Sequence, residues 1–181
     1  VRLCSKPMPG TNAQEPMPRN QTTRIRMYTI LFVCHGNICR SPMGEMIMKQ
    51  LVREQGLEDV FTIASCATSR EEIGNPVYPP ARRKLTEHGI DCSGKTARQL
   101  QNDDYEEYDL LIGMDQANLR NMHRICGGDF EDKMHLLMEY TERPGDVADP
   151  WYTGDFEATW RDVLEGCQGL LHKLTEAKTQ C

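Results

Sequence analysis

The sequence predicts a single α/β domain in which a central four-stranded parallel sheet lies between two layers of helices. Short apolar runs alternate along the chain with longer amphipathic segments, as expected for parallel strands joined by helical crossovers. The chain has 181 residues, enough for one hydrophobic core. Both observations favour a three-layer α/β/α architecture.

The strands and helices can be placed in order along the chain. A parallel sheet that is covered on both faces needs strands that are mainly apolar, and four runs fit this description. These predicted strands span residues 28–33, 60–64, 110–114 and 134–137. Helices are expected between them at residues 42–55, 78–88 and 116–124. Gly89 is typical of a helix C-cap, and Asp115 is typical of a helix N-cap.

The last helix has the clearest pattern. Its apolar side chains recur at helical spacing and charged residues fill the other positions, which indicates core packing rather than a binding surface. Trp160 is expected to be the largest buried side chain of this stripe. The stripe consists of Phe156, Trp160, Val163, Leu164, Cys167, Leu170, Leu171 and Leu174.

Residues 1–26 differ from the rest of the chain. This segment has four prolines, no aromatic residue and no periodicity, so it cannot bury enough apolar surface to become ordered. We expect a disordered N-terminal extension, either added upstream during expression or produced by an alternative start. No secretory signal or organelle-targeting pattern is recognisable in it. The predicted folded domain comprises residues 27–178.

Charge and cysteine usage narrow the range of partners. The net charge is −6, to which residues 1–26 contribute +4, so the remainder carries −10 and nucleic acid is not an expected partner. No apolar segment suggests a membrane partner. The eight cysteines show no metal-ligand spacing and no disulfide framework, so we expect a metal-free protein with reduced thiols, located in the cytoplasm.

A loop that can bind an anion follows the first strand. Gly36 and Asn37 permit unusual backbone angles, and Ser41 followed by Pro42 is typical of an N-cap with proline at the first helical position. The N–H groups of such a loop and the positive end of the helix stabilise an oxyanion without a metal. The loop runs from Cys34 to Ser41. Besides Cys34 and Arg40, it contains His35, Gly36, Asn37, Ile38, Cys39 and Ser41.

Cys34 and Arg40 give this loop its expected chemistry. A cysteine beside a helix N-terminus and a cation ionises more readily than a free thiol, so Cys34 is expected to be a nucleophile. Arg40 presents a planar fork of donors that matches two oxygens of a phosphate. The alternative is that Cys34 is simply a buried thiol at a strand end.

Residues 34–42 resemble the phosphate-binding loop of the low-molecular-weight protein tyrosine phosphatases, in their bacterial type. Residues 148–154 resemble the Asp-Pro loop of that family, which carries the general acid, and residues 88–90 and 97–99 resemble its middle region. The resemblance extends from about residue 27 to about residue 175. It implies the phosphatase I-like fold and cofactor-free hydrolysis of phosphotyrosine through a phosphocysteine intermediate.

The resemblance also implies a role for Asp149 as the general acid and, later, the general base. From the residues alone, Asp149 before Pro150 is a common turn pair. Asp146 in the same loop and Asp115 after the third strand remain alternative acids.

Further residues are expected around the site. Trp151 and Tyr152 would form an aromatic wall of the substrate cleft, or would only pack their loop on the core. In better-known eukaryotic members the loop after the second strand carries an aromatic residue, whereas residues 68–74 of this chain include Arg70, Glu71 and Glu72, of which Glu71 is expected in the cleft. The family pattern implies that Ser65 and His88 support Asn37 and Ser41, although His88 alone would be explained by its place at a helix C-terminus.

Three enzymatic functions compete. A tyrosine phosphatase would act on phosphotyrosine-containing proteins or small aryl phosphates and release inorganic phosphate. An arginine phosphatase on the same scaffold would have threonine where this chain has Ile38. An arsenate reductase would need relay cysteines, but Met114 occupies the first such position and Cys126 alone cannot complete the relay. A phosphoprotein-binding module without activity is the fourth alternative.

We expect a monomer, with a weak dimer as the alternative, and a redox-sensitive Cys34 that Cys39 can capture as a disulfide.

Overall fold

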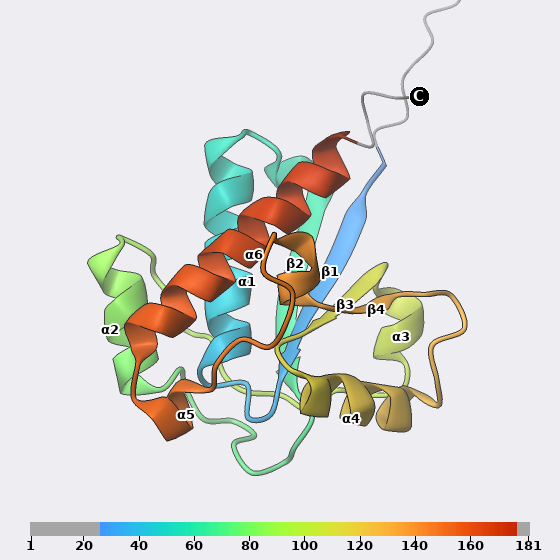
Figure 1. Ribbon diagram of the computed structural model, residues 1–181, viewed down its shortest axis with the longest axis horizontal. Coiled ribbons are helices and arrows are strands. Elements are labelled where there is room, and N and C mark those ends of the chain that lie inside the picture. The colour runs from blue at the N-terminus through green and yellow to red at the C-terminus, as the bar shows by residue number, and fades with distance from the viewer. Residues whose placement is uncertain (1–25, 177–181) are drawn as a thin grey trace, which may run out of the picture.

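The computed structural model of the chain describes residues 26–176. The segment predicted to be disordered lies outside these residues except for Arg26, and so do positions 177 and 178 at the predicted end of the domain. The described residues form one sheet with helices on both faces (Figure 1). None of the helices in this range is long and apolar enough to cross a membrane.

The sheet has four strands, all parallel, in the order β2-β1-β3-β4. This confirms the predicted sheet. The strands are β1 (Tyr28–Cys34), β2 (Phe61–Ala67), β3 (Leu110–Gly113) and β4 (Met134–Leu136). The second strand runs three residues further than predicted, because its last residues stay in register with the end of β1 and pair Cys34 with Ala67.

Four longer helices match the predicted ones to within a few residues. They are α1 (Arg40–Glu54), α2 (Pro79–Glu87), α4 (Gln116–Cys126) and α6 (Phe156–Glu176). Four short elements were not predicted, because one turn of helix leaves no periodic pattern in a sequence. They are η1 (Glu58–Val60), α3 (Asp104–Glu107), η2 (Leu137–Tyr140) and α5 (Pro150–Thr153).

The segment before α6 corrects one expectation, because residues 151–154 were expected to be a loop. They form α5 instead: the Asp149 carboxylate accepts a hydrogen bond from the backbone N–H of Trp151 at 3.0 Å, Pro150 fills the first position, and Gly154 ends the turn at φ +69°. This places Asp149 at a defined helix start.

The two helical layers are separated by the alternation of side chains along β1. Ile30 and Phe32 pack in the core cluster on the side of α1, α2 and α6, whereas Leu31 and Val33 pack in the cluster on the side of α3 and α4. All four side chains are fully buried. The predicted three-layer fold is therefore confirmed, with β1 at its centre.

The stripe of α6 packs into the larger core as predicted. Trp160 is buried and its ring stacks on His88, with ring centroids 3.8 Å apart and an interplanar angle of 7°. Elsewhere on α6, Gly169 lies so close to η2 that a Cβ atom there would overlap the carbonyl oxygen of Tyr140.

Candidate active site

The phosphate-binding loop lies where β1 ends and α1 begins, at the carboxyl edge of the sheet where open parallel sheets bind ligands. Its helix start corrects the sequence analysis. The N-cap of α1 is Cys39 and not Ser41, so Pro42 is the third helical residue. The side chain of Cys39 makes no capping hydrogen bond, and the hydroxyl of Ser41 is turned towards Cys34 instead.

Cys34 lies at the floor of this loop, 3% exposed. Its sulfur receives the backbone N–H of Asn37 at 3.3 Å and lies 3.0 Å from the hydroxyl of Ser41. Asn37 adopts φ +58°, a left-handed conformation that asparagine tolerates better than most residues. This turn directs the Asn37 N–H at the Cys34 sulfur.

The side chain of Asn37 ties the loop to the rest of the fold. Its amide nitrogen lies 2.8 Å from the hydroxyl oxygens of both Ser41 and Ser65, and its oxygen accepts the backbone N–H of Arg98 at 3.2 Å. All three polar residues of this network, Asn37, Ser41 and Ser65, are buried. Ser41 and Ser65, which were predicted to support the loop, thus both contact the side chain of Asn37.

His88 does not join this network, contrary to expectation. Helix α2 packs on α6 and turns the His88 ring onto Trp160. The Ser65 hydroxyl instead contacts Glu45 at 2.5 Å, and Lys95 lies 3.2 Å from the same carboxylate. Sequence reasoning missed both residues. Glu45 was recognisable because it lies one helical turn after Ser41, on the same face of α1; Lys95 lies in an irregular segment and gives no local signal.

Arg40 is 3% exposed and is held by acceptors on two other segments. Its Nη1 donates to Asp115 at 2.7 Å and to the Val147 carbonyl at 3.1 Å, and its Nη2 donates to Asp149 at 2.9 Å. Burial alone would lower the pKa of Arg40, but the charges of Cys34 and of both carboxylates outweigh it and raise the pKa. Arg40 is therefore a fixed cation beside the thiol.

The three acids considered in the sequence have different surroundings. Asp149 and Asp115 both line the cavity above Cys34 and both bind Arg40. Asp115 is also the N-cap of α4, as predicted, because its carboxylate accepts the Asn118 N–H at 2.7 Å. Asp146 accepts the backbone N–H of Gln116 and does not line the cavity.

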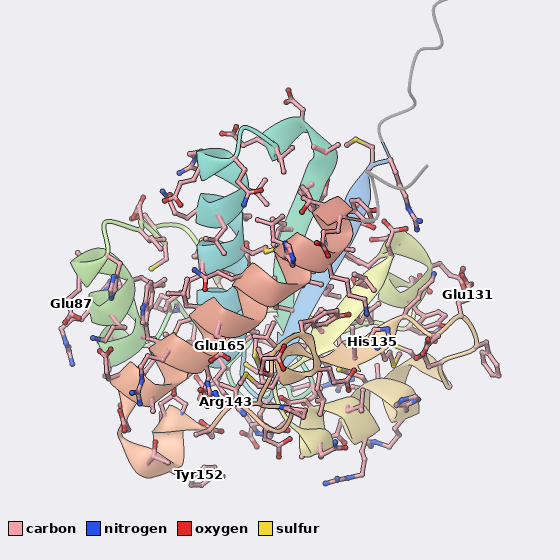
Figure 2. The ribbon with its side chains drawn as sticks, turned by 45° about the horizontal axis from the view of Figure 1, so that its top comes forward. Glu87, Glu131, His135, Arg143, Tyr152 and Glu165 are labelled. Carbon is pink, nitrogen blue, oxygen red and sulfur yellow. The ribbon has the colours of Figure 1, made fainter. Side chains whose placement is uncertain are left out.

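The cavity has a volume of about 300 Å³. Of the predicted cleft residues, Glu71, Trp151 and Tyr152 all line it, and His35 pairs with Glu71 at 3.0 Å. Trp151 is 58% exposed and contacts Tyr78, with ring centroids 5.3 Å apart. Tyr152 is 85% exposed and projects from α5 away from the body of the protein (Figure 2).

The remaining loop residues divide between the cavity and the core. His35, Gly36, Ile38 and Cys39 line the cavity. Glu72, from the charged segment at residues 68–74, also lines it, and a Cβ atom at Gly36 would lie 3.3 Å from its side chain. Burial and the charges of Cys34 and Asp149 raise the pKa of Cys39 to about 12, so this second thiol stays protonated at neutral pH.

A buried cysteine that receives a backbone N–H, a fixed arginine and a carboxylate that lines the same cavity define a thiol-based site for a phosphate group on an open parallel sheet. The family model described as low molecular weight phosphotyrosine protein phosphatase matches residues 29–180 of the chain. The chain therefore belongs to the low-molecular-weight protein tyrosine phosphatase family, and it is a phosphoric monoester hydrolase of that family.

Relatives from bacteria and animals support this assignment. The chain is 36% identical over 156 residues to the low molecular weight protein-tyrosine-phosphatase YfkJ of Bacillus subtilis, which covers 84% of this chain and 99% of that protein. It is also 36% identical over 150 residues to the low molecular weight phosphotyrosine protein phosphatase of Gallus gallus, covering 80% of this chain and 94% of that protein.

Solved structures agree with the sequence comparison. The crystal structure of YfkJ from Bacillus subtilis superposes with a TM-score of 0.82, covering 86% of this chain and 99% of that chain at 36% identity. A structure described as a Drosophila arginine phosphatase superposes with a TM-score of 0.74 at 28% identity, covering 80% of this chain and 96% of that chain.

Proposed function

We propose that this protein hydrolyses phosphotyrosine by double displacement, with Cys34 as the nucleophile. The observation that carries the proposal is the convergence of Cys34, Arg40 and Asp149 on one cavity, from β1, from α1 and from the start of α5. The nucleophile and the anion clamp lie within residues 34–40, whereas the proton donor comes from a distant part of the chain, which local structure alone does not require.

In the first step the Cys34 thiolate attacks phosphorus and forms an S–P bond while the bond between phosphorus and the tyrosine oxygen breaks. Asp149, entering as the carboxylic acid, gives its proton to the leaving oxygen. In the second step the Asp149 carboxylate takes a proton from a water molecule that attacks phosphorus. The S–P bond then breaks, Cys34 leaves as the thiolate, and inorganic phosphate is released.

Arg40 and the loop amides stabilise the negative charge of both transition states. The guanidinium offers two donors in a fixed plane, which suits two equatorial phosphoryl oxygens. In the structure these donors are directed at Asp115 and Asp149. A bound phosphoryl group competes with Asp149 for Nη2, which frees that carboxyl group to turn towards the leaving oxygen.

The cleft supports an aryl ester in preference to phosphoarginine. Trp151 and Tyr78 offer an aromatic surface beside the phosphate-binding loop, against which a phenyl ring can stack. Ile38 is apolar and lines the same cavity, so it offers no hydroxyl to orient water for attack on a guanidinium-linked phosphate. Hydrolysis of phosphoarginine is the second candidate function, because the Drosophila arginine phosphatase shares the fold.

The test is turnover of matched peptides that carry phosphotyrosine, phosphoserine or phosphoarginine in one sequence context. We expect kcat/KM to be highest for phosphotyrosine, and Cys34→Ser to abolish turnover of every peptide. Preference for phosphoarginine would establish the second candidate while leaving the roles of Cys34 and Arg40 intact. Full activity of Cys34→Ser would refute the mechanism itself.

We further propose that the enzyme acts as a monomer on proteins of the cytoplasm. The six cysteines at residues 26–176 are all free, which is compatible with a reducing compartment. Light scattering at micromolar concentration should give the mass of one chain. A weak dimer would appear as a mass that rises with concentration.

A further inference from the structure

A buried ion pair lies directly beneath the phosphate-binding loop. Nζ of Lys95 lies 3.2 Å from Oε2 of Glu45, and their side chains are 12% and 6% exposed. Burying such a pair costs desolvation energy that its attraction often only just offsets, so stability is a weak explanation for its presence. The groups that the pair holds in place offer a better one.

The directions of the hydrogen bonds above the pair can be worked out from Asn37. Its amide nitrogen can only donate, so the hydroxyl oxygens of Ser41 and Ser65 must both accept from it. Each hydroxyl must then give its own proton to another group. For Ser65 that acceptor is Oε2 of Glu45, at 2.5 Å.

At the other end of the network, the Ser41 hydroxyl must likewise donate its proton to an acceptor. Its possible acceptors are the sulfur of Cys34 at 3.0 Å and the carbonyl oxygen of Cys66 at 3.3 Å. A thiolate is the charged and nearer acceptor, so the proton of Ser41 points at Cys34 when the thiol is ionised. The orientation of Asn37 thus decides whether this proton is available to the sulfur.

Lys95 fixes the carboxylate of Glu45, the acceptor on which these hydrogen-bond directions depend. Its Nζ donates to the carbonyl oxygen of Ser65 at 3.0 Å while pairing with Glu45, so the carboxylate and the strand are held on one cation. Lys49 binds the other carboxylate oxygen of Glu45 at 2.6 Å, but its side chain is 41% exposed and it makes no hydrogen bond to Ser65.

We propose that Lys95 is a positioning residue for the nucleophile: through Glu45 and Ser65 it holds Asn37 in the orientation that turns the Ser41 hydroxyl proton towards Cys34. Lys95 itself touches neither substrate nor sulfur. This inference rests on the proposed function for its catalytic consequence, but its effect on the thiol can be measured without any substrate.

The experiment compares Lys95→Met, which removes the charge at similar length, with Lys95→Arg, which keeps it, and with Lys49→Met as the matched control on the same carboxylate. Alkylation of Cys34 by iodoacetamide is followed between pH 5 and pH 9 by mass spectrometry of the peptide that contains it. The buried Cys39 does not interfere, because its pKa of about 12 keeps it protonated. On a phosphotyrosine peptide, kcat, KM and inhibition by inorganic phosphate are also measured.

For Lys95→Met we expect the pH of half-maximal alkylation to rise by about 0.5 to 1 unit and kcat to fall about tenfold, as for loss of one hydrogen bond of ordinary strength. Inhibition by inorganic phosphate should change less than about twofold, because Arg40 and the loop amides hold that ion. The kcat of Lys95→Arg should stay within about threefold of that of the unmodified enzyme. The kcat and the alkylation profile of Lys49→Met should match those of the unmodified enzyme.

The proposal is overturned if Lys95→Met leaves the alkylation profile unchanged, or if Lys49→Met shifts it equally. It is also overturned if phosphate inhibition weakens as much as kcat falls, because that result means collapse of the loop rather than loss of orientation. If Lys95→Met does not fold, Ser65→Ala interrupts the same path at its next link and must give the same shift. An unmodified enzyme that fails to hydrolyse phosphotyrosine refutes the proposed function, while the alkylation profiles still decide the role of Lys95.

Discussion

Replacing Asp149 by asparagine separates the two tasks that the structure gives this residue. One carboxylate oxygen accepts the Trp151 N–H at 3.0 Å and starts α5, and the other accepts from Arg40 at 2.9 Å. Asparagine is as good an N-cap as aspartate, so α5 should persist. Its amide, however, cannot give a proton to a leaving oxygen. Asp149→Asn should therefore remove the proton transfer and leave the fold intact.

The expected loss follows from the size of general acid catalysis. A positioned acid contributes about 10²- to 10⁴-fold, which corresponds to roughly 2.7 to 5.4 kcal/mol of transition-state stabilisation at about 1.36 kcal/mol per factor of ten. Phosphate affinity should be equal or higher in the variant, because Arg40 loses a competing charged partner. The fall should thus appear in kcat and not in inhibition by inorganic phosphate.

A series of aryl phosphates with increasingly acidic phenols provides the assay. Phosphotyrosine needs a proton on its leaving oxygen, whereas a nitrophenol leaves without one, so the loss in kcat should shrink as the phenol becomes more acidic. Asp146→Asn serves as the control, since Asp146 binds a backbone N–H outside the cavity. An equal loss across the series, or an unaffected rate with phosphotyrosine, would remove Asp149 from the role of acid.

Three further outcomes are expected. Gly169→Ala should lower the melting temperature by about 4 to 8 °C, because overlap with the Tyr140 carbonyl outweighs the roughly 1 kcal/mol gain in helix propensity; an unchanged or higher value would contradict the close packing of α6 on η2. Peroxide should inactivate the enzyme reversibly, because a sulfenic acid on Cys34 condenses with the Cys39 thiol to a disulfide and water. If, after peroxide treatment, a reductant restores the activity of Cys39→Ser as fully as that of the unmodified enzyme, Cys39 does not protect Cys34. Burial alone would raise the pKa of Asp129, but hydrogen bonds from a tyrosine hydroxyl and two backbone N–H groups outweigh it and lower the pKa. Its stabilising effect should be complete above the unfolded value of about 3.9 and decline as pH falls through the folded one, so the stability gap between the unmodified enzyme and Asp129→Asn in urea should narrow below about pH 4; a gap that stays constant from pH 7 to pH 3 would refute this linkage.

The fold was predictable for segments in which apolar residues run together or recur at a regular spacing. The strands are mostly apolar and α6 carries a long stripe, so the number of strands and their parallel direction follow from the sequence. The short helices α3 and α5 escaped prediction because a single turn is set by local caps and by packing. Asp149 illustrates this: its pairing with Pro150 was read as a turn, yet the same residues also start a helix.

The site was predictable to the extent that its residues are neighbours in the sequence. Cys34, Arg40 and the loop between them form a compact motif, and the resemblance to a known family extended it to Asp149. The supports of the loop come from other segments, and here prediction failed: His88 was assigned where Glu45 and Lys95 lie. That assignment depends on how α2 and the segment after it pack, which is a tertiary property that no local pattern encodes.

The backbone contacts around the phosphate-binding loop carry a consequence for how such enzymes diversify. Three main-chain hydrogen bonds join the loop to residues 68–78: Thr68 N–H to the Cys34 carbonyl, Ser69 N–H to His35, and Tyr78 N–H to Ile38. None involves a side chain, so substitutions such as those that place Glu71 and Glu72 at the rim leave the attachment intact. Selectivity for new phosphoproteins can therefore be acquired by changing the rim while the catalytic apparatus beneath it is inherited unaltered.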